Sequence, residues 1–162
     1  MQSSTRTPAD DGLFMPAEWE KHERCWMQWP SRGEVWGEQL PLAYVAYANV
    51  ARAIARFEPV SMVCNAADEA QARLACGREI EIVPLDIDDS WARDSGPIFV
   101  TDGVGGVAGV HWRFNAWGNA YWPHDKDAKV GGSILERLKM RRYDGPMILE
   151  GGPSALMVTA LC

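Results

Sequence analysis

The sequence predicts an α/β fold with strands in mixed directions, and three observations lead to this prediction. Strand-like and helix-like segments alternate between residues 24 and 85. Two β-rich segments then follow each other across the loop 102–106, which is typical of a hairpin. The chain has 162 residues, of which 47% are hydrophobic and 23% charged, so it is long enough to bury the core of one domain.

The first half of the chain predicts its elements by residue periodicity. Arg24–Pro30 alternates like a strand and ends at a proline, which cannot donate to a β ladder. Apolar residues recur at helical spacing in the segment Gln39–Phe57, namely Leu42, Val45, Ala46, Val50, Ile54 and Phe57. Three further elements are predicted: a buried strand at Pro59–Cys64, a helix from the N-cap Asn65 to Leu74, and an alternating strand at Glu79–Leu85.

The second half begins with a charged turn and continues with four elements. Ile98–Thr101 and Val107–Trp112 are the two predicted hairpin strands. A helix at Ala128–Met140 and a strand at Pro146–Leu149 follow. We interpret the basic run Lys139–Arg142 as a solvated helix end, where positive charge favours the helix dipole.

Charge and composition exclude several classes of protein. The formal net charge is −6, which argues against a nucleic-acid partner and suits a small cationic ligand. The polar N-terminus lacks the apolar core of a signal peptide, and nowhere do roughly 18 apolar residues run together, so we expect a cytoplasmic protein without a membrane partner. The four cysteines have no paired or CxxC spacing, so the sequence suggests neither a zinc knuckle nor a secreted disulfide framework.

The segment DDSWARDSGP concentrates carboxylates around one indole, that of Trp91. We place Asp94 at the end of a strand and before a Gly-Pro turn, where it is held rigidly and can accept parallel N–H bonds from a guanidinium. Strand alternation would send Arg93 to the opposite face, whereas a surface ion pair of the two is the alternative. If Asp94 and Trp91 share a cavity, an acid and a ring face together suit a flat cation.

A second acid occurs in a similar context. Glu150 precedes Gly151 and Gly152 after a predicted strand, as Asp94 precedes a Ser-Gly-Pro turn, so repeated structural units or chance could explain the similarity. The two glycines allow another backbone or a ligand to approach closely. Two carboxylates can bind a guanidinium, but they can equally perform acid–base chemistry on a sugar, where Trp platforms are also common.

Tryptophan is the unusual component of this chain, with eight residues. Clusters of Trp line ligand sites, although an aromatic-rich core also explains them. The segment Trp112–Asn119 contains two of them and no clear period, which predicts a loop that either forms the wall of a site or is pinned to the core.

Four motifs in the same order resemble the agmatine deiminase family, which is related to bacterial-type peptidylarginine deiminases. They are MPAEWEKHER from Met15, DDSWARDSGP from Asp88, WRFNAWGN from Trp112, and LEGG from Leu149. The resemblance runs from about Gly12 to Gly152 and matches only the N-terminal part of the family.

The resemblance implies a pentein-type fold, an α/β propeller of strand-strand-helix-strand units, here an incomplete set of about two. It implies hydrolysis of the guanidine carbon of agmatine to N-carbamoylputrescine and ammonia, a step toward putrescine, without a metal or organic cofactor. The implied catalytic acids are Asp94 and Glu150. The implied substrate-binding residues are Trp91, Asp88, Asp89, Trp117 and Glu18. A homo-oligomer stays an open expectation.

The sequence departs from the family in its length and its ending. The family's nucleophilic Cys and general-base His lie in later units, and none of the four cysteines here occupies the nucleophile motif. In the family, LEGG is typically followed by a segment like VDGDGTL, whereas this chain continues PSALMVTALC. Reading Leu156–Val158 one nucleotide earlier gives Asp-Gly if the Leu codon ends in G, since Met is ATG and Val begins GT.

We therefore hypothesise a frameshift after about Gly152, and a genuine short relative is the competing explanation. DNA downstream that encodes no deiminase segment with His-x-Asp or Cys would contradict the frameshift. The expected organisation is a flexible segment 1–14, a deiminase portion 15–152 and an atypical tail 153–162. Three functions are compared: an agmatine-type deiminase, a guanidinium-binding module or inactive remnant without a nucleophile, and a Trp-rich carbohydrate-active domain.

Overall fold

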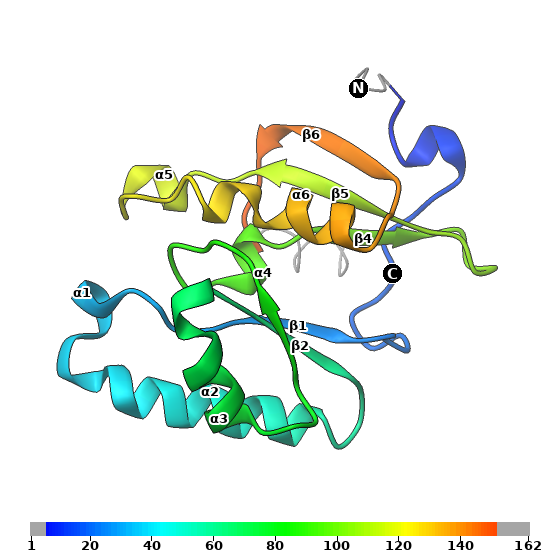
Figure 1. The fold of residues 1–162 in the computed structure, drawn as a ribbon. Coiled ribbons are helices and arrows are strands. Elements are labelled where there is room, and N and C mark those ends of the chain that lie inside the picture. Colours follow the sequence, from blue (N-terminus) through cyan, green and yellow to red (C-terminus); the bar gives the residue numbers. More distant parts are fainter. Residues whose placement is uncertain (1–5, 152–162) are drawn as a thin grey trace. The chain divides into compact units, whose positions relative to one another are not determined.

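The computed structural model describes residues 6–151, and the predicted atypical tail 153–162 lies outside the described residues. Within this range the chain forms two compact units (Figure 1). Unit 1 contains residues 6–20, 93–122 and 128–151, and unit 2 contains residues 21–92 and 123–127. Each unit contains one three-stranded sheet, and the α/β class predicted from the sequence is confirmed.

Unit 2 is built on the parallel sheet β1-β2-β3, with β1 at Cys25–Gln28, β2 at Val60–Cys64 and β3 at Glu81–Pro84. The helical elements of this unit are α1 (Gly33–Trp36), η2 (Gly37–Gln39), α2 (Leu40–Ile54), η3 (Ala66–Asp68) and α3 (Glu69–Cys76). The predicted strands and helices are thus present with shifted ends. The parallel order follows from the helical crossovers that join successive strands.

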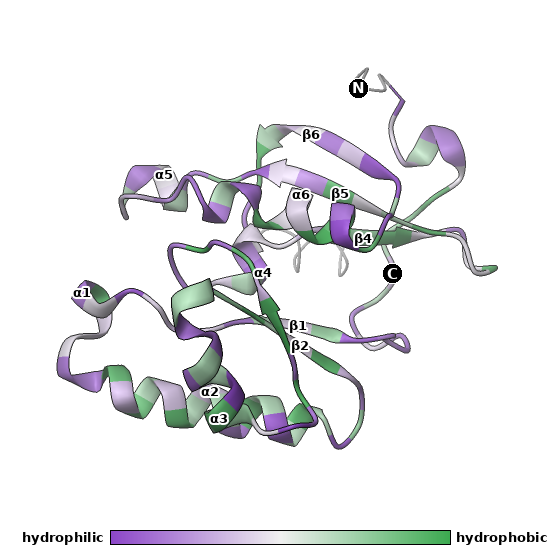
Figure 2. Cartoon of the chain, viewed as in Figure 1, coloured by the Kyte–Doolittle hydropathy of each residue, from purple (hydrophilic) through white to green (hydrophobic). Residues whose placement is uncertain are grey.

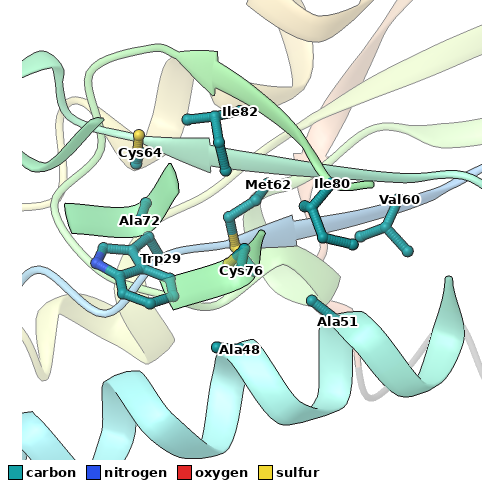
Figure 3. Packing of buried hydrophobic residues seen from close by; sticks show 10 residues of the cluster. All are labelled: Trp29, Ala48, Ala51, Val60, Met62, Cys64, Ala72, Cys76, Ile80 and Ile82. Atoms are coloured by element: carbon teal, nitrogen blue, oxygen red, sulfur yellow. The ribbon is translucent and has the colours of Figure 1, made fainter. Parts of the chain in front are cut away.

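The core of unit 2 lies between this sheet and the helices α2 and α3 (Figure 3). Trp29 is fully buried, and its ring stacks on that of Tyr44 at a centroid distance of 5.1 Å. Ala48 and Ala51 of α2 face Met62 of β2, and their small side chains permit close packing of helix and sheet. The core therefore depends on alanines opposite large residues.

The buried face of α2 is not formed by most of the apolar residues whose spacing predicted this helix. Leu42, Val45, Val50 and Phe57 are exposed by 65%, 56%, 50% and 85%. Figure 2 shows hydrophobic residues along the whole length of α2. Periodicity correctly predicts this helix, but an almost entirely apolar helix offers more than one face of similar hydrophobicity.

Two other local predictions need correction. Asn65 occupies the predicted N-cap position, that of η3, but its side chain does not cap the helix; its Oδ1 instead accepts the backbone N–H of Ile87 at 3.0 Å. The basic run Lys139–Arg142 is not a solvated helix end. Lys139 has a φ of 53°, which ends the helical path, and β6 begins at Arg142.

Unit 1 is built on the sheet β4-β5-β6, with β4 at Ile98–Thr101, β5 at Val107–Arg113 and β6 at Arg142–Ile148. The first two strands form the predicted antiparallel hairpin, and β5 pairs with β6 in parallel. Its helical elements are η1 (Ala9–Asp11), α4 (Ala92–Ser95, entered from unit 2), α5 (Ala116–Asn119) and α6 (Asp127–Arg137). The predicted strand Pro146–Leu149 thus begins earlier, at Arg142.

The two faces of this sheet have different covers. On one face Val100, Val110 and Tyr143 form a small core to which Leu13 from the N-terminal segment is added. On the other face Leu135 of α6 lies against Gly109 of β5. The order β4-β5-α6-β6 is therefore a strand-strand-helix-strand arrangement.

The N-terminal segment is attached to unit 1 by polar contacts. Phe14 forms an isolated antiparallel bridge with Thr101, and Asp11 accepts a hydrogen bond from the Tyr143 hydroxyl at 2.7 Å. Asp11 also forms an ion pair with Arg141. The flexibility predicted for residues 1–14 stays a prediction.

Candidate functional site

Asp94 lies in the short helix α4 and not at the end of a strand, so the strand alternation predicted for DDSWARDSGP is wrong. Consecutive residues in a helical turn still point about 100° apart. Arg93 forms an exposed ion pair with Glu18, at 2.9 Å between Nη1 and Oε1. Such exposed pairs contribute little to stability, and this one gives Glu18 a partner other than a ligand.

The carboxylate of Asp94 is half-buried and accepts two hydrogen bonds within unit 1. The backbone N–H of Gly151 donates to its Oδ1 at 3.2 Å, and the side chain of Trp117 donates to it as well. Burial raises the pKa of Asp94 above its ordinary value, and the charge of Glu150 adds to this, whereas the two hydrogen bonds and Arg93 lower the pKa. Asp94 is therefore a desolvated acid next to a second acid.

Glu150 accepts its hydrogen bonds from backbone N–H groups of the segment 115–117. The backbone N–H of Trp117 donates to Oε1 at 2.9 Å, and the N–H of Asn115 donates to the same oxygen at 3.4 Å. Among the described residues, no donor reaches Oε2 of Glu150. The structure thus brings together Asp94, Glu150 and Trp117, which lie far apart in the sequence.

The segment Trp112–Asn119 is only in part a loop. Trp112 and Arg113 belong to β5, and residues 116–119 form the turn α5. Trp117 contacts Phe114 and Tyr121 edge-on, each at a centroid distance of 5.8 Å. These rings give the turn an apolar base, as expected for a segment pinned by its aromatics, and its role as a site wall stays a prediction.

The residue that follows Glu150, Gly151, lies too close to α4 to carry a side chain. A Cβ at this position would lie 2.3 Å from Arg93 Cγ and 2.7 Å from the Arg93 carbonyl oxygen. The close approach of another backbone, expected from the sequence, is that of α4. It allows the Gly151 N–H to reach Asp94.

Replacing Gly151 with Ala is expected to push this segment away from α4 and to lengthen the hydrogen bond to Asp94. The overpacking should destabilise unit 1 by about 1–3 kcal/mol, and the pKa of Asp94 should rise further because an N–H donor to its charged form is lost. Urea unfolding and an NMR pH titration of Asp94 check this. Gly33→Ala is the matched control, since a Cβ there meets nothing within 4 Å. Equal Asp94 titrations in the wild type and Gly151→Ala would contradict the expectation.

Asp88, Asp89 and Trp91 belong to unit 2, and the predicted pairing of Trp91 with Asp94 stays a prediction. Asp88 Oδ2 accepts the backbone N–H of Lys126 at 2.8 Å. Asp89 is buried, accepts the Ser90 N–H at 2.8 Å and lies 3.9 Å from Arg32 Nε. Both side chains therefore have partners in their own unit, and their predicted contact with substrate stays a prediction.

Two residues of these loops were missed by sequence reasoning. Asp127 accepts the backbone N–H groups of Asp88 at 2.8 Å and Asp89 at 3.0 Å. Asn115 accepts the N–H of Gly118 with its side chain at 3.0 Å. A signal existed for each, because Asp precedes the predicted helix at Ala128 and Asn precedes a segment containing Gly. The signal at Asn115 is consistent with its local partner Gly118, whereas the signal at Asp127 does not indicate the distant Asp88 and Asp89.

Two features are absent from residues 6–151. Within residues 6–151, no three or more His, Cys, Asp or Glu side chains are grouped so that they could hold a metal ion. None of the helices in the same range combines the length and the apolar character that crossing a membrane requires.

The fold is that of an α/β protein with two acids held close together, and comparison with known proteins identifies its family. Residues 14–156 match the model of the Porphyromonas-type peptidyl-arginine deiminase family. The chain belongs to this family, and the resemblance deduced from the four motifs is confirmed.

The related proteins are named agmatine deiminases. The chain is 46% identical to that of Pseudomonas aeruginosa (strain LESB58) over 159 residues, which cover 94% of this chain and 43% of the relative. It is 44% identical to that of Stutzerimonas stutzeri (strain A1501), with the same coverage of both chains. The solved agmatine deiminase of Enterococcus faecalis is 38% identical, with a TM-score of 0.85 over 90% of this chain and 41% of that one. The chain thus spans about two fifths of the length of these relatives.

Proposed function

We propose that this chain supplies the guanidinium-binding carboxylates of an agmatine deiminase. In the whole enzyme, agmatine would be hydrolysed at its guanidine carbon to N-carbamoylputrescine and ammonia. The observation that supports the proposal most directly is that Asp94 and Glu150 lie close together within one unit. Gly151, the residue after Glu150, donates its N–H to Asp94, and Trp117 donates to both acids.

The chemistry of the pair suits a guanidinium. This cation is planar and presents several N–H donors, which two adjacent carboxylates can accept in parallel. The cation also removes the repulsion between the two acids, because it lies near both negative charges. Two anchored carboxylates fix the plane of the guanidinium, so that a thiolate can attack its carbon from a defined direction.

The nucleophile is proposed to come from a cysteine outside this chain. Burial raises the pKa of Cys25 and Cys76, and it raises the pKa of Cys64 to about 11. These thiols would stay protonated at neutral pH, whereas attack requires a thiolate. Cys162 lies outside the described residues. A chain that binds the guanidinium without turnover, as a binding module or inactive remnant, is therefore the second candidate.

The remaining expectations follow the same proposal. The strand-strand-helix-strand order of unit 1 supports a pentein-type propeller unit. The net charge of −6 favours a cationic small molecule over nucleic acid as the partner. A cytoplasmic location and a homo-oligomeric state are proposed with the family assignment.

Ammonia release and ligand binding together test the proposal. We expect the 162-residue chain to release no ammonia from agmatine, and to bind agmatine in an NMR titration that shifts the signals of Asp94, Trp117 and Gly151. Putrescine is the matched control ligand, because it has the same carbon chain but no guanidinium. Equal binding of both ligands would contradict the proposed guanidinium site. Turnover of agmatine would contradict the proposal that the nucleophile comes from outside this chain.

A further inference from the structure

The turn Ala116–Asn119 has a left-handed backbone at four consecutive residues. The φ angles are 50° at Ala116, 55° at Trp117, 77° at Gly118 and 62° at Asn119. Residues with a Cβ visit this region rarely and usually one at a time, because the Cβ then approaches the following carbonyl oxygen. Three of these four residues carry a Cβ, so this conformation costs free energy that other contacts must offset.

Local hydrogen bonds and packing hold the turn. The Asn115 side chain accepts the N–H of Gly118 at 3.0 Å, and its backbone oxygen accepts the N–H of Asn119 at 2.7 Å. Ala116 is only 2% exposed, and Phe114 packs edge-on against the ring of Trp117. The conformation is therefore fixed from several directions.

The turn presents two donors of a single residue to two acids. The backbone N–H of Trp117 donates to Glu150, and its side chain donates to Asp94. The two carboxylates carry like charges, which repel each other and favour separation. A rigid residue bonded to both opposes that separation, while Oε2 of Glu150 receives no donor from the described residues.

We propose that the left-handed turn is a positioning element in which Trp117 holds the carboxylates of Asp94 and Glu150 at the separation that one guanidinium requires. The inference rests on the proposed function, which supplies the guanidinium as the ligand of this site. It assigns to Trp117 a role through its two N–H groups, in addition to the substrate contact implied by the family resemblance. Strained backbone is commonly retained where it preorganises a functional group.

Trp117→Phe in the full chain separates the donor from the ring. We expect the variant to fold with unchanged amide signals away from the turn, and the apparent pKa of Asp94, followed by the ¹³C signal of its carboxyl group, to rise because a donor to its charged form is lost. Agmatine binding should weaken about tenfold, the effect of one hydrogen bond to a charged group. Trp122→Phe is the matched control, an aromatic substitution in the same unit at a residue that is 72% exposed, and should change neither quantity.

Backbone variants test the turn itself. Gly118→Val places a β-branched side chain at a φ of 77° and should reproduce both effects of Trp117→Phe, whereas Asn119→Gly relieves strain and should preserve both wild-type values. An unchanged Asp94 titration in Trp117→Phe and Gly118→Val would overturn the positioning role. If the titration moves but the wild-type chain binds agmatine no better than putrescine, the positioning role stands and the proposed function fails.

Discussion

Asp94→Asn is expected to reduce the affinity of the chain for agmatine by about 10- to 150-fold, with little loss of stability. The amide oxygen of Asn can still accept the N–H of Gly151, so the local structure should persist. The negative charge is lost, and hydrogen bonds to charged groups contribute about 1.5–3 kcal/mol. Calorimetric titration with agmatine measures the affinity, and a urea unfolding curve measures the stability.

The pH dependence of binding provides a second measurement of the same group. Because the pKa of Asp94 is raised, agmatine affinity should fall as the pH decreases through that pKa, where the carboxylate becomes protonated. Asp94→Asn should remove this part of the pH dependence. Asp86→Asn, in unit 2, changes the net charge equally and should retain wild-type binding. If both variants bind agmatine equally, overall charge and not a specific contact attracts the ligand.

Sequence periodicity predicted the elements of this fold better than it predicted their faces. The helix α2 was expected from apolar spacing, yet its buried residues include Ala48 and Ala51, and Leu42 and Val45 are exposed. The reason is the opposing surface, since Trp29 and Met62 occupy the volume and leave space for alanine only. The spacing of apolar residues in a helix contains no information on the size of the side chains that pack against it.

The candidate site shows a similar division. Asp94 and Glu150 were named from their motifs, and the structure connects both through Trp117. The helical conformation of α4 and the left-handed turn were not predicted. Asn and Gly are the residues that favour a positive φ, but Ala116 and Trp117 adopt it only because contacts distant in sequence stabilise it.

The loop that precedes α4 depends on Asp127, which is 2% exposed and accepts two backbone N–H groups. Burial raises the pKa of Asp127 to about 6, and the charges of Asp88 and Asp89 add to the increase, against the effect of the two N–H donors. Asp127 and Asp88 also bond reciprocally, because Asp88 Oδ2 accepts the N–H groups of Lys126 and Asp127. Removal of this carboxyl group should therefore loosen residues 88–89 and 126–127 together.

The raised pKa fixes the sign of the pH dependence of stability. Below the ordinary value of 3.8, Asp127 is protonated in the folded and unfolded states, and its contribution is fully present. As the pH rises from 3.8 through about 6, the unfolded chain loses the proton first, so this group's contribution to the free energy of unfolding falls. The difference between the pKa of the folded and the unfolded state corresponds to a loss of about 3 kcal/mol.

Asp127→Asn and Asp127→Ala distinguish charge from hydrogen bonding. Asn retains an oxygen that can accept the N–H groups of Asp88 and Asp89, and it carries no charge. It should therefore abolish the pH dependence between about pH 4 and 6 and make the chain more stable than the wild type at neutral pH, by up to about 3 kcal/mol. Ala leaves the buried N–H of Asp89 and the partly buried N–H of Asp88 without this acceptor, and such a loss costs about 1–3 kcal/mol for a buried group. Urea unfolding at several pH values, with hydrogen exchange of the Asp88 and Asp89 amides, checks both. A pH dependence in Asp127→Asn equal to that of the wild type would show that another group titrates, and fast amide exchange in Asp127→Ala alone would confirm the hydrogen-bonding role.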